Sequence, residues 1–98
     1  MVVIKEPISF QWDRGNIGKN EKSHEVTEKE AEETFFDKKK VIYTDKFHSE
    51  KEDRFILIGK TREKRLLYLV FTKRGTKMRI ISARDINRKE VKYYVEKT

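Results

Sequence analysis

The chain contains no cysteine, a single proline and four glycines among 98 residues. The lack of cysteine excludes disulfides, thiolate catalysis and Cys-ligated zinc or iron–sulfur sites. It agrees with a reducing compartment, and we expect a cytoplasmic protein. No apolar run approaches the roughly 20 residues of a membrane span, and the first residues lack the apolar region of a signal peptide. We therefore expect no membrane association.

Motifs for metals and cofactors are also missing. His24 and His48 are too far apart in the sequence to form a standard zinc motif. The sequence has no glycine-rich loop of the kind that cradles phosphates, and no recognisable helix-turn-helix. We expect no cofactor and no metal.

Charge is what the chain has in abundance. Charged residues make up 42% of the sequence, and 24 Lys and Arg outnumber 17 Asp and Glu, for a net charge of +7. Acidic residues concentrate in 21–33 and basic residues in 73–92. Such a basic surface favours a polyanionic partner, either nucleic acid or an acidic protein, although positive charge can also serve solubility alone.

The hydrophobic pattern predicts one α+β domain spanning 1–98, with helices packed on a mostly antiparallel, twisted sheet. Its order is β-α-α-β-β-β-β-α. Asp13 and Asp85 are the expected N-caps of the first and last helices, and Thr27 with Glu30 forms a capping box for the second. The expected strands are 8–12, 41–43, 54–60, 65–73 and 77–83, and the expected helices are 14–22, 28–36 and 86–96.

The last of these strands carries two arginines, Arg79 and Arg84, in an otherwise apolar stretch. A buried guanidinium needs a partner, which is either a carboxylate of the same chain or an anionic ligand such as phosphate. The two arginines differ by five positions, so a regular strand would place them on opposite faces. Both can serve one site only if the strand bends or bulges near Ser82 and Ala83; otherwise one arginine is structural.

The side chains near this strand are compatible with RNA cleavage without a metal. That reaction needs a base, positive charge at the phosphate and an acid. Arginine suits the phosphate, and His48 and Glu90 are the candidates for proton transfer. Each has a simpler interpretation: His48 as a loop histidine, Glu90 as the neutralising partner of an arginine, and Glu52 with Arg54 as a local ion pair. Tyr93 could orient a group or stack on a base.

Four blocks of the sequence carry a family resemblance. The last two are the more specific, and the string from Arg79 to Arg84 is close to a family signature. The blocks are Phe10-Gln11-Trp12-Asp13 with Asn20 and His24-Glu25-Val26; Glu30-Ala31 with Phe35-Phe36-Asp37; Asp45, His48-Ser49-Glu50, Glu52, Arg54-Phe55 and Ile58-Gly59; and Thr72-Lys73-Arg74, Arg79-Ile80-Ile81-Ser82-Ala83-Arg84, Glu90 and Tyr93 or Tyr94. The chain resembles the BrnT family of bacterial ribonuclease toxins, which have a RelE-like fold.

The resemblance implies a type II toxin that cuts RNA, halts translation and is neutralised by a BrnA-like ribbon-helix-helix antitoxin, with operator DNA bound only through the complex. Together with the cluster of basic residues, it indicates Arg79 and Arg84 as catalytic residues at the scissile phosphate, and His48 and Glu90 as catalytic residues for proton transfer. Supporting residues would be Glu52, Arg54, Thr72, Arg74, Ser82, Tyr93 and Lys22. The family usually has Lys-His-Gly where this chain has Ser23-His24-Glu25, so Lys22 would replace that lysine; Lys38 stands where proline is common. The alternative is a non-catalytic module that binds protein or nucleic acid, such as a degenerate toxin that keeps only the antitoxin contact.

Overall fold

The computed structural model describes residue 4 and residues 8–46 and 52–95. Strand order in its five-stranded sheet is β1-β5-β4-β3-β2, with β1 parallel to β5 and the other neighbours antiparallel. The elements are β1 (Ser9–Phe10), α1 (Lys19–His24), α2 (Glu28–Glu33), the 3-10 helix η1 (Thr34–Phe36), β2 (Val41–Thr44), β3 (Arg54–Lys60), β4 (Leu66–Arg74), β5 (Lys77–Asp85) and α3 (Val91–Val95). The predicted α+β class and mostly antiparallel sheet are confirmed.

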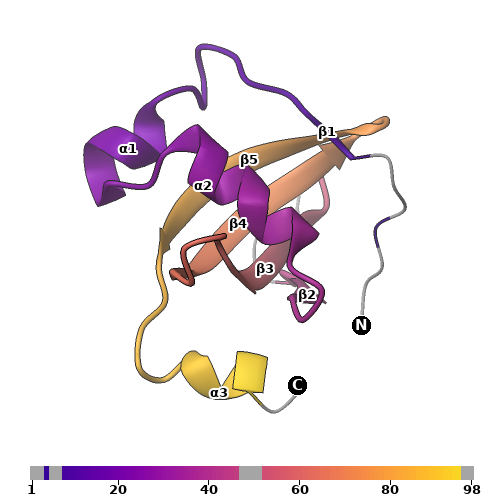
Figure 1. The fold of residues 1–98 in the computed structure, drawn as a ribbon. Helices are drawn as coiled ribbons and strands as arrows, with labels where there is room; N and C mark the ends of the chain where they lie inside the picture. Colours follow the sequence, from indigo (N-terminus) through magenta and orange to yellow (C-terminus); the bar gives the residue numbers. More distant parts are fainter. Residues whose placement is uncertain (1–3, 5–7, 47–51, 96–98) are drawn as a thin grey trace.

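The two faces of the sheet are covered by different helices. Figure 1 shows α1 and α2 crossing one face, whereas α3 lies apart from them beyond the end of β5. We call the face under α1, α2 and η1 the inner face; its core is centred on Phe35, which meets Phe10 and Phe71 edge to face at centroid distances of 5.1 and 5.0 Å. On the opposite, outer face, Tyr94 of α3 packs with Val41 and Ile58. The outer face beside β5 is therefore left to polar side chains.

The three long strands agree closely with the sequence pattern. β3 has the predicted bounds, and β4 and β5 each end within two residues of them. Gly75 in the β4–β5 turn has φ 61°, which a residue without a Cβ adopts at little cost. Local sequence signals predict the bounds of these strands because hydrophobic alternation and turn residues act over only a few positions.

The first helix differs from the prediction. α1 begins at Lys19, after Gly18 in the left-handed conformation, and continues through His24, whereas the predicted helix spans 14–22. Asp13 is therefore not its N-cap. Instead, Asp13 closes a turn: its carboxylate accepts from the backbone N–H of Gly15, and its carbonyl accepts from that of Ile17.

The last helix is also shorter than predicted. Asp85 is the final residue of β5, and its carboxylate accepts two hydrogen bonds from Arg65 at 2.7 and 2.9 Å, so it is not available as a cap. Asn87 and Glu90 instead exchange side chain–backbone bonds of 3.0 Å just before α3. None of the helices in the described ranges is long and apolar enough to cross a membrane.

Candidate functional site

A β-bulge in β5 brings both arginines of the signature to one face. Phe71 of β4 opposes Ile80, whereas the preceding Val70 opposes Ser82, so Ile81 is the extra residue. Directly opposed residues project to the same face, and the partners of Arg79 and Arg84 lie four positions apart on β4. Both arginines therefore project from the outer face. The predicted irregularity exists, but it lies at Ile81 and not at Ser82–Ala83.

Arg79 is held by the turn that precedes α1. Its guanidinium donates to the Asp13 carboxylate at 3.0 Å, and its Nε is buried without a hydrogen-bond partner among the described residues. A Cβ on Gly15 would lie 2.5 Å from the guanidinium, so glycine is what lets the turn approach this closely. Hydrogen bonds from Gln11 and from Arg79 lower the pKa of Asp13 to about 2. Asp13 is thus an ionised partner of Arg79.

Arg84 is held in a different way. It donates two hydrogen bonds to Glu90, at 2.9 and 2.7 Å, and its guanidinium lies 4.1 Å from the centre of the Tyr68 ring. The hydrogen bonds from Arg84 hold the pKa of Glu90 below its usual value. Glu90 therefore neutralises Arg84 within the fold, which is the simpler of its two interpretations. The bidentate ion pair with Glu90 and the contact with the Tyr68 ring together fix the plane of the Arg84 guanidinium.

A third arginine–carboxylate pair involves Arg74, the last residue of β4, next to the turn that leads into β5. Arg74 donates to Glu52 at 3.3 and 3.1 Å, and this contact lowers the pKa of Glu52. Thr72 is buried, and its hydroxyl donates to the Asp53 carbonyl at 2.8 Å, which fixes the segment that carries Glu52. Arg54 is opposite Thr72 in register and so projects from the outer face as well.

Not all of the remaining predicted site residues lie on the outer face with the arginines. Ser82 lies on the outer face between the two arginines of β5. Tyr93 is in α3, where its ring contacts Tyr43 at a centroid distance of 6.2 Å and is 45% exposed. Lys22 belongs to α1, in the layer over the inner face. His48 lies outside the described residues.

The outer face offers two separated cationic positions. Because their partners on β4 are four residues apart, the Cα atoms of Arg79 and Arg84 are about 13 Å apart along the strand. Their side chains are also anchored to different segments, Asp13 before α1 and Glu90 before α3. Two such guanidiniums can contact different anionic groups of one extended ligand.

Metal ligands do not gather at this face among the residues that the structure describes. Among the described residues, no three His, Asp or Glu side chains are grouped so that they could hold a metal ion. The carboxylates of Asp13, Glu52 and Glu90 each accept from an arginine. Guanidinium is thus the main charged group here, and its planar fork matches phosphate oxygens.

Two participants in the site are not evident from the sequence. Asp13 has the sequence context of a helix cap, because an acidic residue before a polar stretch is typical of one. Tyr68 falls among the apolar residues of the expected strand 65–73. A guanidinium over an aromatic ring has no sequence signal when the partners are on different strands, so only the register of β4 and β5 reveals it.

Residues 12–90 match the family described as "Ribonuclease toxin, BrnT, of type II toxin-antitoxin system". The chain belongs to the BrnT family. No curated protein gives a significant match. The family match covers the three arginines of the outer face that are paired with carboxylates, together with those carboxylates, from Asp13 to Glu90. The family description is of ribonuclease toxins of type II toxin–antitoxin systems, so an antitoxin partner is implied.

The Asp13–Arg79 pair predicts a pH-dependent stability. The pKa of Asp13 in the folded protein, about 2, lies below its usual value of 3.8, so its contribution is fully present above pH 4 and is lost as the pH falls toward 2. We expect Asp13→Asn to melt at a lower temperature than the wild type at pH 7, with the difference shrinking between about pH 4 and 2. Thermal melts across this range measure it; a difference independent of pH would contradict the assignment.

Proposed function

We propose that this chain is a metal-independent endoribonuclease toxin that binds RNA across the outer face. The observation that carries the proposal is the bulge at Ile81, which puts Arg79, Ser82 and Arg84 of the family signature on one face. The family description supplies ribonuclease activity. The outer face supplies fixed guanidiniums, the groups best suited to phosphate oxygens in a reaction that develops negative charge.

In the proposed reaction, the 2′-hydroxyl of the substrate attacks the adjacent phosphorus and the 5′-oxygen leaves. Arg84 stabilises the charge on the scissile phosphate, and Arg79 holds another phosphate of the same strand, because the two lie about 13 Å apart. Glu90 has a lowered pKa, which makes it a weak base near neutrality, so we assign it to orienting Arg84. His48 remains the proposed proton-transfer residue, because imidazole titrates near neutral pH.

The remaining residues have supporting roles in this proposal. Arg74, paired with Glu52, and Arg54 extend the basic track along β3 and β4. Thr72 and Ser82 are polar contacts within the track. Tyr93 and Lys22 would contact an RNA strand that extends beyond the basic track.

The biology follows from the family. We propose a RelE-like toxin domain that acts in the cytoplasm and arrests translation by cutting RNA. A BrnA-like ribbon-helix-helix antitoxin would neutralise it, and operator DNA would be bound only through that complex. The implied antitoxin partner and the net charge of +7 support an acidic or nucleic-acid ligand.

Incubating the purified protein with RNA in the presence of EDTA tests this function. We expect fragments that end in 2′,3′-cyclic phosphates, because the attacking group is the substrate's own hydroxyl. Retained RNA binding without fragments would favour the alternative, a non-catalytic module that keeps only its binding functions.

A further inference from the structure

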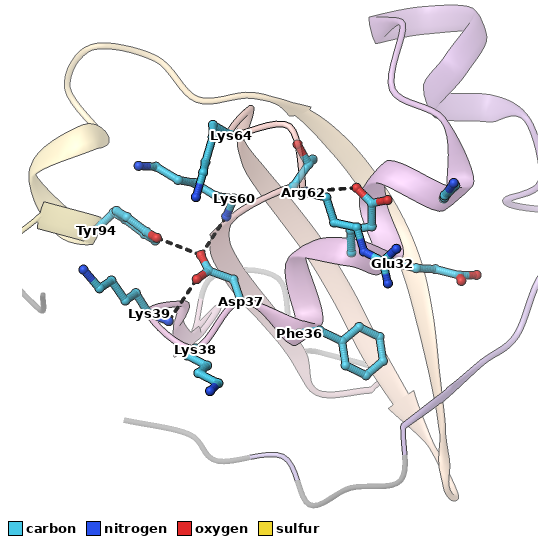
Figure 2. A pocket seen from close by; sticks show the side chains of 12 residues that line it. Glu32, Phe36, Asp37, Lys38, Lys39, Lys60, Arg62, Lys64 and Tyr94 are labelled. Atoms are coloured by element: carbon cyan, nitrogen blue, oxygen red, sulfur yellow. Dashed lines mark hydrogen bonds between the residues drawn. The ribbon is translucent and has the colours of Figure 1, made fainter.

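An open pocket of about 630 Å³ lies away from the outer-face arginines, where η1, the β3–β4 turn and α3 meet (Figure 2). We call it the lysine pocket. Six cationic side chains and three carboxylates line it. The cations are Lys29, Lys38, Lys39, Lys60, Arg62 and Lys64. A pocket of this volume is large enough for a nucleotide-sized ligand.

The carboxylates of the lysine pocket are bound to neutral donors. Asp37 accepts from the Tyr94 hydroxyl at 2.7 Å and from the backbone N–H groups of Lys60 and Lys39 at 2.8 and 2.9 Å, the three bonds drawn around it in Figure 2. Glu33 accepts from the Arg62 backbone N–H, and Glu32 from the indole of Trp12.

The side-chain charges of the six cations are consequently left for another ligand. Within the described part of the chain, none of the six forms an ion pair. This separates the pocket from the outer face, where the carboxylates of the chain itself already neutralise Arg74, Arg79 and Arg84. Lys60 lies over the Tyr94 ring at 5.7 Å from its centre, and an anion entering the pocket displaces no carboxylate from any of the six cations.

An exposed aromatic ring completes the pocket. Phe36 is 54% exposed, although its neighbour Phe35 is fully buried. Phe10 supports the Phe36 ring from one side, edge to face, at a centroid distance of 6.5 Å. A basic groove beside an accessible aromatic ring is the arrangement that binds single-stranded nucleic acid, with phosphates on the cations and a base stacked on the ring.

The lysine pocket is also within reach of the proposed cleavage site. Lys60 opposes Leu66 of β4, and Arg84 opposes Tyr68, two positions further along the same strand. Lys60 and Arg84 therefore lie at the same end of the sheet, two strand spacings or about 10 Å apart across the strands. One RNA strand can contact both.

We propose that the lysine pocket binds a nucleotide of single-stranded RNA outside the cleavage site, with the base on Phe36 and the phosphates on the lysines. The proposal rests on the proposed function in one respect, that RNA is the substrate. The pocket contributes affinity for the strand, and the outer face contributes chemistry.

Binding of a labelled 2′-O-methyl oligouridylate of about ten nucleotides tests the proposal by fluorescence anisotropy. This probe lacks the attacking hydroxyl and cannot be cleaved by the proposed route. We expect Phe36→Ala to raise Kd by roughly 5- to 100-fold. We expect Lys38→Gln/Lys39→Gln to reduce the slope of log K against log salt by about 1.4, or 0.7 for each phosphate that is no longer neutralised.

Matched controls are Ile17→Ala, at an equally exposed apolar residue, and Lys19→Gln/Lys73→Gln, which removes two exposed charges outside the pocket. Wild-type affinity and salt slope in both pocket variants would overturn the proposal. So would unchanged RNA binding with impaired antitoxin binding, which would assign the pocket to the antitoxin. If the wild type binds the probe through the pocket but cuts no RNA, the proposed function fails and the pocket proposal stands.

Discussion

Replacing Arg84 by alanine is expected to slow RNA cleavage by about 10²- to 10³-fold, the usual cost of removing one fixed donor from a developing anion. The guanidinium of Arg84 is fixed because Glu90 accepts two hydrogen bonds from it and the Tyr68 ring supports its plane. Arg84→Lys should recover little of the rate, since an ammonium cannot reproduce the planar fork. Single-turnover cleavage at saturating protein measures the effect on chemistry.

Arg88→Ala is the matched control, because Arg88 is an exposed cation four residues away. It should cleave RNA within about twofold of the wild type, in line with the small effects of surface substitutions. Thermal melting of each variant establishes that it is folded. Cleavage by folded Arg84→Ala at the rate of the control would remove Arg84 from the reaction.

Phe35→Ala is expected to have the largest effect on stability, about 3–5 kcal/mol. Its ring is fully buried and joins Phe10 of β1 to Phe71 of β4 through edge-to-face contacts. Removing it leaves a cavity in the inner face, and the loss is a large part of the roughly 5–15 kcal/mol typical of a folded domain. Urea denaturation of the purified variant measures the change in the free energy of unfolding.

The adjacent phenylalanine provides the control for this prediction. Phe36 is 54% exposed, so Phe36→Ala should cost less than about 1 kcal/mol. Equal destabilisation by both substitutions would mean that the inner core is not arranged around Phe35.

The parts of the fold that sequence predicts well are those set by neighbouring residues. Thr27 and Glu30 form the predicted capping box, in which the Glu30 N–H donates to the Thr27 hydroxyl at 3.1 Å and the Thr27 N–H donates to the Glu30 carboxylate at 3.0 Å. Alternation along β3, β4 and β5 likewise predicts their bounds to within two residues. These signals act over a few positions and do not depend on tertiary contacts.

The candidate site was less predictable because its contacts join distant residues. Asp13 and Arg79 are 66 positions apart, and only the docking of the first turn onto β5 makes them partners. Alternation alone predicts that Arg79 and Arg84 project from opposite faces of the sheet, whereas the bulge at Ile81 places both on the same face. Nothing in the local sequence fixes the position of this bulge to one residue. Asp85 has the local context of a cap, but Arg65, 20 positions away, binds its carboxylate.

The central claim is that RNA is cut on the outer face by fixed guanidiniums. The most direct measurement is single-turnover cleavage of one RNA in EDTA by the wild type and by Arg79→Ala/Arg84→Ala, at saturating protein and with folding verified. The account predicts cleavage by the wild type and a loss of at least about 10²-fold in the double variant. A folded double variant that cuts the RNA as fast as the wild type would contradict it.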